Sequence, residues 1–486
     1  MTMTRRGQAG SGTIRRAAAV LLCLFSGCAT SSLFNPYPTQ TAPLIRRMEQ
    51  GQTVETGNVF GRRILGRDRI LYRMEQGRLA QIQGDWAASR AAYEESIAAV
   101  REMDGRAVVS VSDMAGKTSA LMINDNAIPY SGDGYERVML HHEQALNYLF
   151  AGDVEGAGVE VRLASAQQAE ALKRRALEVA EAQDRARREG IPEVQSGDLN
   201  TLYARLDAVA GRVKDSFQNA YTFYMSAVVR EMLDDPGGAY IDYKKAAEIE
   251  PANPYVRADV RRLAETLGME EESAAFRARW PEAVPRRVPP GQGEVIVFFE
   301  DGFLPARREF SVFIPLFGSG GWTSIALPVY PRVREFAQAV TVQLDSGAAG
   351  DTALICDLNA LAARALRERM PAILTRQVVR ATAKAMVPSL ARGGEADILT
   401  IIMSLYSLIS ERADLRSWTT LPQAAQIMRT ACPPGHQVIT LTHRGTGARV
   451  VCDVEIKPGG RTIVWAVRSG GRLTARAVAF GADGRP

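Results

Sequence analysis

A unit of two short helices joined by a turn recurs in the first half of the chain. Its clearest copy, FYMSAVVREMLDDPGGAYIDYKKAAEIEPANP, spans residues 223–254. The small residues Ala227 and Ala246 allow two antiparallel helices to approach closely. Tyr243 fills the gap to the next pair, and Pro251 stops the second helix. This spacing predicts stacked helix pairs of the tetratricopeptide (TPR) type.

Two looser copies of the unit lie upstream. GRLAQIQGDWAASRAAYEES and ALNYLFAGDVEGAGVEVRLA carry similar small residues and tyrosines around turns at Gly84 and Gly152. Residues 105–135, between these turns, read instead as short extended segments and further turns, so we expect the array to be interrupted. Generic helical hairpins without superhelical stacking are the alternative interpretation.

The first 27 residues are typical of an export signal. They hold four arginines and no acidic residue, followed by an apolar run from Ala17 to Phe25 that is too short to span a membrane. The next residues, Phe25-Ser26-Gly27-Cys28, resemble the lipobox of bacterial lipoproteins, in which the cysteine becomes the acylated N-terminus after cleavage. We therefore expect a lipid anchor on Cys28, and an ordinary signal peptide with an incidental Cys28 is the alternative.

Removal of the signal changes the charge balance of the chain. The signal holds four of the 59 basic residues and none of the 54 acidic ones, which leaves a mature net charge of +1. Binding to nucleic acid needs a basic face, so we expect no nucleic-acid partner. The hydrophobic content of 46% is that of an ordinary globular protein.

The composition predicts an α+β multidomain chain. Prolines suggest a tether in 28–60, and the segment WPEAVPRRVPPGQG suggests a linker between domains. The expected units are a signal peptide at 1–27, a tether at 28–60, a TPR-like helical repeat domain at 61–279 with a non-helical insert at about 105–135, a linker at 280–293, and a mixed α/β domain at 294–486.

The C-terminal domain is expected to mix strands and helices. Apolar segments rich in β-branched residues predict strands, namely GEVIVFFEDG, REFSVFIPLF, TSIALPVY and QAVTVQLDS. A helix is expected over 352–386, with a break at Pro371, and two hairpins over 436–456 and 461–480. The apolar segment 397–414 is too short to span a membrane, so we expect a buried core helix, with peripheral membrane contact as the alternative.

Three cysteines remain besides Cys28 in the mature chain, namely Cys356, Cys432 and Cys452. In an oxidising compartment, three cysteines permit one disulfide and one free thiol. Cys432 and Cys452 flank a predicted hairpin, so we expect any disulfide to join them. No CxxC motif indicates a zinc ribbon or a redox site.

The sequence contains no recognisable catalytic constellation. Neighbouring residues on a helix point about 100° apart, so His141 and His142 cannot easily hold one metal ion. Glu300 and Asp301 could act as glycosidase carboxylates, but adjacent strand residues face opposite ways. We therefore expect no catalytic residue, metal or cofactor. Trp418 is expected to be a buried aromatic side chain that locks the loop before the last hairpins.

Several segments together resemble a family of poorly characterised bacterial TPR lipoproteins of the cell envelope. These segments are GYERVMLHHEQALNYLFAGDVEGAGVEVR, FQNAYTFYMSAVVREMLDDPGGAYIDYKKA, FFEDG, ALPVY and ADLRSWTTLP. The resemblance spans most of the mature chain and implies an envelope protein. Genes of that family often lie near those for lipoproteins that activate cell-wall synthases. The resemblance brings no set of enzymatic residues with it.

These observations favour an interaction or assembly factor that is anchored through Cys28. The residue after the cysteine is Ala29 and not an aspartate, which resembles the pattern of lipoproteins sorted to the outer membrane. In a diderm host the protein would then face the periplasm. We expect a protein partner in a concave groove lined by the first helix of each pair. The expected groove residues are Arg78, Gln81, Asn147, Thr222 and Arg230.

Two other classes of function remain open at this point. An enzyme acting on cell-wall polymer could use carboxylates such as Glu300 and Asp301. A subunit of a secretion or pore assembly could place the segment 397–410 against the membrane. The expected groove residues could also pack against the C-terminal domain instead of a partner.

Overall fold

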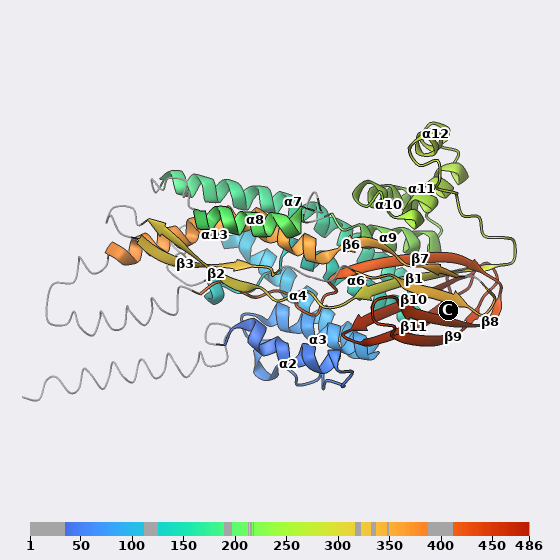
Figure 1. The fold of residues 1–486 in the computed structure, drawn as a ribbon, viewed down its shortest axis with the longest axis horizontal. Coiled ribbons are helices and arrows are strands. Elements are labelled where there is room, and N and C mark those ends of the chain that lie inside the picture. The colour runs from blue at the N-terminus through green and yellow to red at the C-terminus, as the bar shows by residue number, and fades with distance from the viewer. Residues whose placement is uncertain are drawn as a thin grey trace, which may run out of the picture.

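Helices fill the first half of the chain and sheets dominate the second half in the computed structural model (Figure 1). The signal, Cys28 and nearly all of the apolar segment 397–414 lie outside the part that the structure describes. The described residues are 35–110, 125–188, 197–211, 213, 216, 218–315, 322–331, 337–347, 349–386 and 412–485.

Consecutive helices of the first half pack against each other as hairpins, α3 with α4, α6 with α7 and α9 with α10. The described helices of this half are α2 (Tyr37–Glu49), α3 (Arg69–Gln83), α4 (Trp86–Ser110), α6 (Gly134–Phe150), α7 (Val154–Arg188), α8 (Gly197–Ala210), α9 (Ala220–Met232), α10 (Pro236–Ile249), α11 (Pro254–Thr266) and α12 (Glu270–Arg279), with short 3-10 helices η1 (Gly61–Leu65) and η2 (Asp125–Ala127). The predicted helical pairs are therefore present.

Small residues bring the paired helices close together, as the sequence predicts. A Cβ atom added to Gly77 of α3 would lie 2.4 Å from Cε1 of Tyr93 on α4. The first hairpin therefore depends on a glycine at this position. The turn between these helices begins at Gly84, the C-cap of α3, whose φ of 86° lies in the left-handed region that favours glycine.

Three sheets make up most of the second half. The largest has the strand order β11-β10-β1-β7-β6, in which β1 is parallel to β10 and antiparallel to β7. A two-stranded sheet pairs β2 with β3, and a third has the order β5-β4-β8-β9. The strands are β1 (Gly293–Asp301), β2 (Arg308–Pro315), β3 (Trp322–Val329), β4 (Val340–Leu344), β5 (Ala349–Asp351), β6 (Ala353–Asp357), β7 (Ala424–Cys432), β8 (Gly435–His443), β9 (Arg449–Ile456), β10 (Arg461–Ser469) and β11 (Arg472–Phe480).

The two predicted hairpins are confirmed as β8 with β9 and β10 with β11. The helix expected from residue 352 begins later, as α13 (Leu358–Met386), because the preceding residues pair with β7 as strand β6. Pro371 lies inside α13 and does not end it. Strand β7, which lies between β1 and β6, is absent from the sequence-based expectations.

The expected tether over 28–60 is wrong where the structure describes it, because α2 forms part of the folded body. Tyr37 and Met48 are buried, and the Tyr37 hydroxyl donates a hydrogen bond of 2.7 Å to Glu75 of α3. The non-helical insert at about 105–135 is narrower than expected, since α4 continues to Ser110 and α6 begins at Gly134.

The helical half and the largest sheet share one hydrophobic core. A single cluster of buried apolar side chains runs from Tyr37 of α2 to Phe480 of β11. Trp86 of α4 lies 5.5 Å from Trp465 of β10, measured between ring centroids. The two large sheets lie at one end of the elongated molecule, and the β2–β3 hairpin lies at the other beside α8 and α13 (Figure 1).

Candidate functional site

Four of the five expected groove residues lie in the interior, and Arg78 among them lies where the helices meet the largest sheet. Arg78 is fully buried, and its guanidinium donates to Glu143 of α6 at 2.8 Å and to Glu300 of β1. Tyr221 of α9 donates to the same Glu300 carboxylate at 3.0 Å. This surface of the helical array is therefore covered by the chain's own sheet.

The other expected groove residues follow the same pattern, with one exception. Gln81 is buried and donates to Asn147 at 3.1 Å, and Thr222 is buried as well. Arg230 is partly exposed, but it pairs with Asp235 and Asp242. The expectation of an open groove is wrong for Arg78, Gln81, Asn147 and Thr222, because all four are buried inside the folded body. Glu300 of β1 and the Thr420 carbonyl cover Arg78, whereas Gln81 and Asn147 bond to each other and to neighbouring helices.

That loop, residues 412–423, has little regular secondary structure and yet is largely buried between the helices and the sheet. Glu75 of α3 accepts hydrogen bonds from the amide and the hydroxyl of Thr419, at 2.7 and 2.8 Å, and from the hydroxyl of Thr420. Trp418 is completely buried, as predicted, and its amide donates to Glu136 at 2.7 Å. Side chains of the helical half thus hold an irregular loop of the C-terminal half.

Burial shifts the titration of two groups on α6, namely Glu136 and His142. It raises the pKa of Glu136 to about 7, and the negative charge of Asp133 adds to the effect. It lowers the pKa of His142 to about 3, because a charged imidazolium would lose its solvation there. Both groups therefore favour their neutral forms more strongly in the folded chain than they do in water.

The two adjacent histidines have separate environments. His141 lies 2.6 Å from the Glu160 carboxylate through Nδ1, whereas His142 packs against the ring of Tyr221. Within the described ranges, no cluster of three or more histidine, cysteine or acidic side chains could hold a metal ion.

The carboxylates that an enzyme acting on cell-wall polymer could use are both buried and paired with arginines. Glu300 pairs with Arg78, whereas Asp301 accepts a hydrogen bond from Arg468 of β10. Both carboxylates are at most 1% exposed, and each is committed to a different arginine. Glu300 and Asp301 therefore do not form an accessible catalytic pair.

The expected disulfide is also wrong. Cys356, Cys432 and Cys452 are all free and buried. Cys432 ends β7 in the five-stranded sheet, whereas Cys452 lies on β9 in the four-stranded sheet. The two cysteines flank β8, but they belong to different sheets.

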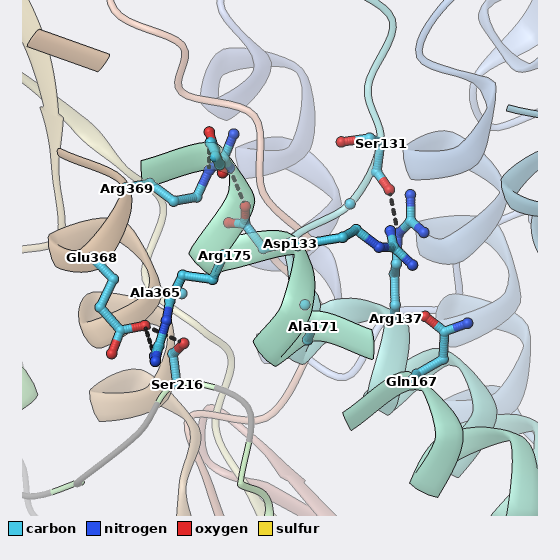
Figure 2. Close-up of a pocket in the computed structure, with 14 residues that line it drawn as sticks. Ser131, Asp133, Arg137, Gln167, Ala171, Arg175, Ser216, Ala365, Glu368 and Arg369 are labelled. Carbon is cyan, nitrogen blue, oxygen red and sulfur yellow. Dashed lines mark hydrogen bonds and ion pairs between the residues drawn. The ribbon is translucent and has the colours of Figure 1, made fainter. Parts of the chain in front are cut away.

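A cavity of about 130 Å³ opens between the start of α6, the middle of α7 and α13 (Figure 2). Arg175 of α7 lies 2.9 Å from the Glu368 carboxylate of α13, and Ser216 donates to the same carboxylate at 2.6 Å. Figure 2 shows Arg175 and Ser216 converging on Glu368 at one side of the cavity. This side of the cavity therefore joins α7 to α13 through charged groups.

Asp133 occupies another side of this cavity, just before α6. Burial alone would raise the pKa of its carboxyl, but Arg307 and Arg369 together hold that pKa below its usual value. Both arginines also form ion pairs with Asp133. An anionic ligand would have to compete with carboxylates that already hold the guanidinium groups.

A second, larger pocket of about 650 Å³ lies between α11, residues 285–292 and the turn from β9 to β10. Its charged lining residues are Arg262, Glu265, Arg286, Arg287, Glu294 and Arg461. The side chain of Arg287 is 86% exposed, and its ion pair with Glu265 spans 3.9 Å. This pocket therefore offers a more accessible cation than the first. Sequence analysis located the proline-rich segment but did not predict a pocket beside it.

No protein-family model matches the chain, and no curated protein shows significant similarity to it. Among the described helices, none is both long and apolar enough to cross a membrane. The function must therefore be inferred from the residues and geometry of the chain itself.

Proposed function

We propose that the chain is a lipid-anchored cell-envelope protein that acts as a TPR-type interaction or assembly factor. In this proposal, Cys28 carries the lipid, and the folded body faces the periplasm from the outer membrane of a diderm host. The sequence resemblance to envelope TPR lipoproteins and the lipobox-like motif before Cys28 support it. The partner is a protein of the envelope.

The way in which the helical hairpins hold residues 412–423 carries this proposal. Glu75 on the first helix of its pair binds backbone amides and hydroxyls at the turn of Thr419 and Thr420 in this loop. Arg78, one turn further along α3, makes a longer contact of 3.4 Å with the Thr420 carbonyl. Stacked repeat pairs present concave surfaces of this kind, which such proteins use for binding. Because this inner surface is occupied by the chain itself, the partner binds to the outside of the body.

In-cell crosslinking of the wild-type protein, followed by mass spectrometry of the crosslinked species, tests this proposal. We expect the same envelope protein to be recovered in replicate experiments, with crosslinks at exposed positions such as Lys245 and not at the buried loop. An unrelated lipoprotein expressed at the same level is the control. Recovery of the same set of proteins by that control would contradict a specific interaction role.

The anchor is tested separately by the substitution Cys28→Ser. A serine cannot form the thioether to lipid, so we expect the variant to leave the membrane fraction or to retain its uncut signal. Fractionation and labelling with a fatty-acid probe measure the two effects. Cys356→Ser is the control, because this cysteine is buried in the folded body. Absence of label on the wild-type protein would refute the lipid anchor.

A further inference from the structure

The larger pocket lies beneath a proline-rich strap, which we define as residues 285–292. The strap connects the last helix of the helical half to β1 and runs along the outside of the body (Figure 1). Its end is fixed to the turn between β9 and β10, because the Gly459 amide donates to the Gln292 carbonyl at 3.1 Å. The strap thus forms one wall of a pocket of about 650 Å³.

The lining of this pocket carries an excess of positive charge. Four arginines line it against two glutamates. Three of these four arginines already pair with buried acids, namely Arg262 and Arg461 with Glu231, and Arg286 with Asp259 at 3.8 Å. Arg287 projects into solvent at the rim, where its only carboxylate among the described residues is Glu265 at 3.9 Å. An anion arriving from solvent would therefore meet a weakly paired guanidinium.

The main chain of the strap also has free hydrogen-bonding capacity. Among the described residues, none accepts a hydrogen bond from the backbone amides of Arg286, Arg287 or Val288. Pro285, Pro289 and Pro290 flank these amides and cannot donate, which limits main-chain pairing to this short stretch. An extended peptide could pair with such a segment, with arginine side chains selecting its charge.

We propose that this pocket binds an extended acidic segment of a partner protein. Carboxylates of the segment contact Arg287 and its neighbours, and its main chain runs along residues 286–288. The length of the strap and its unpaired amides favour a peptide over a compact anion. This inference rests on the proposed function and names the chemistry of its partner.

Binding of a short fluorescein-labelled peptide of alternating glutamate and serine to the mature full-length protein tests the proposal. We expect saturable binding, which is lost when glutamine replaces each glutamate of the peptide. Arg287→Glu should weaken binding about tenfold or more, because it replaces attraction by repulsion at an exposed rim position. Arg106→Glu is the matched control, since Arg106 is 78% exposed on α4 and lies outside the pocket.

A second variant separates peptide binding from simple anion binding. Val288→Pro removes one strap amide and leaves every charge in place, so we expect weaker binding of the peptide and an unchanged circular dichroism spectrum. Equal binding of the glutamate and glutamine peptides, or equal affinity of Arg287→Glu and wild type, would overturn the proposal. Wild-type affinity of Val288→Pro, together with full competition by inorganic phosphate, would indicate an anion site only and also overturn it.

Crosslinking in cells distinguishes failure of the peptide-binding proposal from failure of the proposed interaction role. Recovery of the same partner by wild type and by Arg287→Glu, at equal yield, would leave the interaction role intact and place the contact elsewhere. Loss of that partner in Arg287→Glu but not in Arg106→Glu would support the pocket as the contact.

Discussion

Replacement of Arg78 by methionine is expected to lower the free energy of unfolding by about 3–5 kcal/mol. The guanidinium is 1% exposed and lies between the carboxylates of Glu143 and Glu300, so its removal leaves buried acids without a counter-charge. Burial already raises the pKa of Glu143, and Arg78 opposes that shift. Without Arg78 the pKa of Glu143 in the folded state rises further. The variant should therefore lose more stability at high pH, where the buried acids are charged, and less at low pH, where they are protonated.

Urea denaturation of wild type and variant at several pH values measures this effect. The control is Arg106→Met, because Arg106 is 78% exposed and pairs with Glu102 on its own helix. We expect the control to change stability by less than about 0.5 kcal/mol. Adding Glu300→Gln to Arg78→Met should recover part of the loss, since it removes one of the stranded charges. Equal stability of Arg78→Met and the control at pH 8 would show that Arg78 does not hold the two halves together.

Local patterns in the sequence predicted the elements that local physics determines. The glycines at the turns and the close contact of Gly77 with Tyr93 belong to single hairpins, so their signals lie within one short segment. The strands of the last two hairpins likewise carry their β-branched residues and turn glycines side by side. These elements needed no knowledge of distant residues.

The position of the expected groove residues depended on contacts between distant parts of the chain. Arg78 reads as a surface residue because its partner Glu300 lies far away in the sequence, at the end of a buried strand. The sequence does contain one indication of this contact. Glu300 lies in the apolar run GEVIVFFEDG, and a carboxylate buried in such a strand needs a buried cation as its partner. The sequence does not say which of its many arginines supplies it.

One wall of the pocket beneath the strap was predictable from local sequence, and the opposite wall was not. Its prolines and Arg287 were visible as a change of composition between two expected domains. Its opposite wall comes from Gly459 and Arg461, which reach it only because β10 pairs with β1 in parallel. Parallel pairing joins strands that are distant in sequence, so local periodicity could not predict this wall.

Replacement of Trp418 by alanine is expected to destabilise the folded chain by about 3–5 kcal/mol. The side chain is completely buried, contacts the ring of Tyr93 at 5.9 Å between centroids, and donates through Nε1 to the Thr420 hydroxyl at 3.1 Å. Alanine would leave a cavity between the helices and the loop 412–423, and it would release the loop from α3. Thermal and urea denaturation measure the loss.

The chain offers a matched control for this substitution in Trp322, which is 68% exposed at the start of β3. Trp322→Ala removes the same side chain without opening a cavity, so we expect its effect to stay below about 1 kcal/mol. Hydrogen exchange adds a local readout. In the wild type the Thr419 amide donates a hydrogen bond to the Glu75 carboxylate, so release of the loop should increase exchange at this amide. Equal effects of the two alanine variants, with unchanged protection at Thr419, would mean that Trp418 does not lock the loop against the helices.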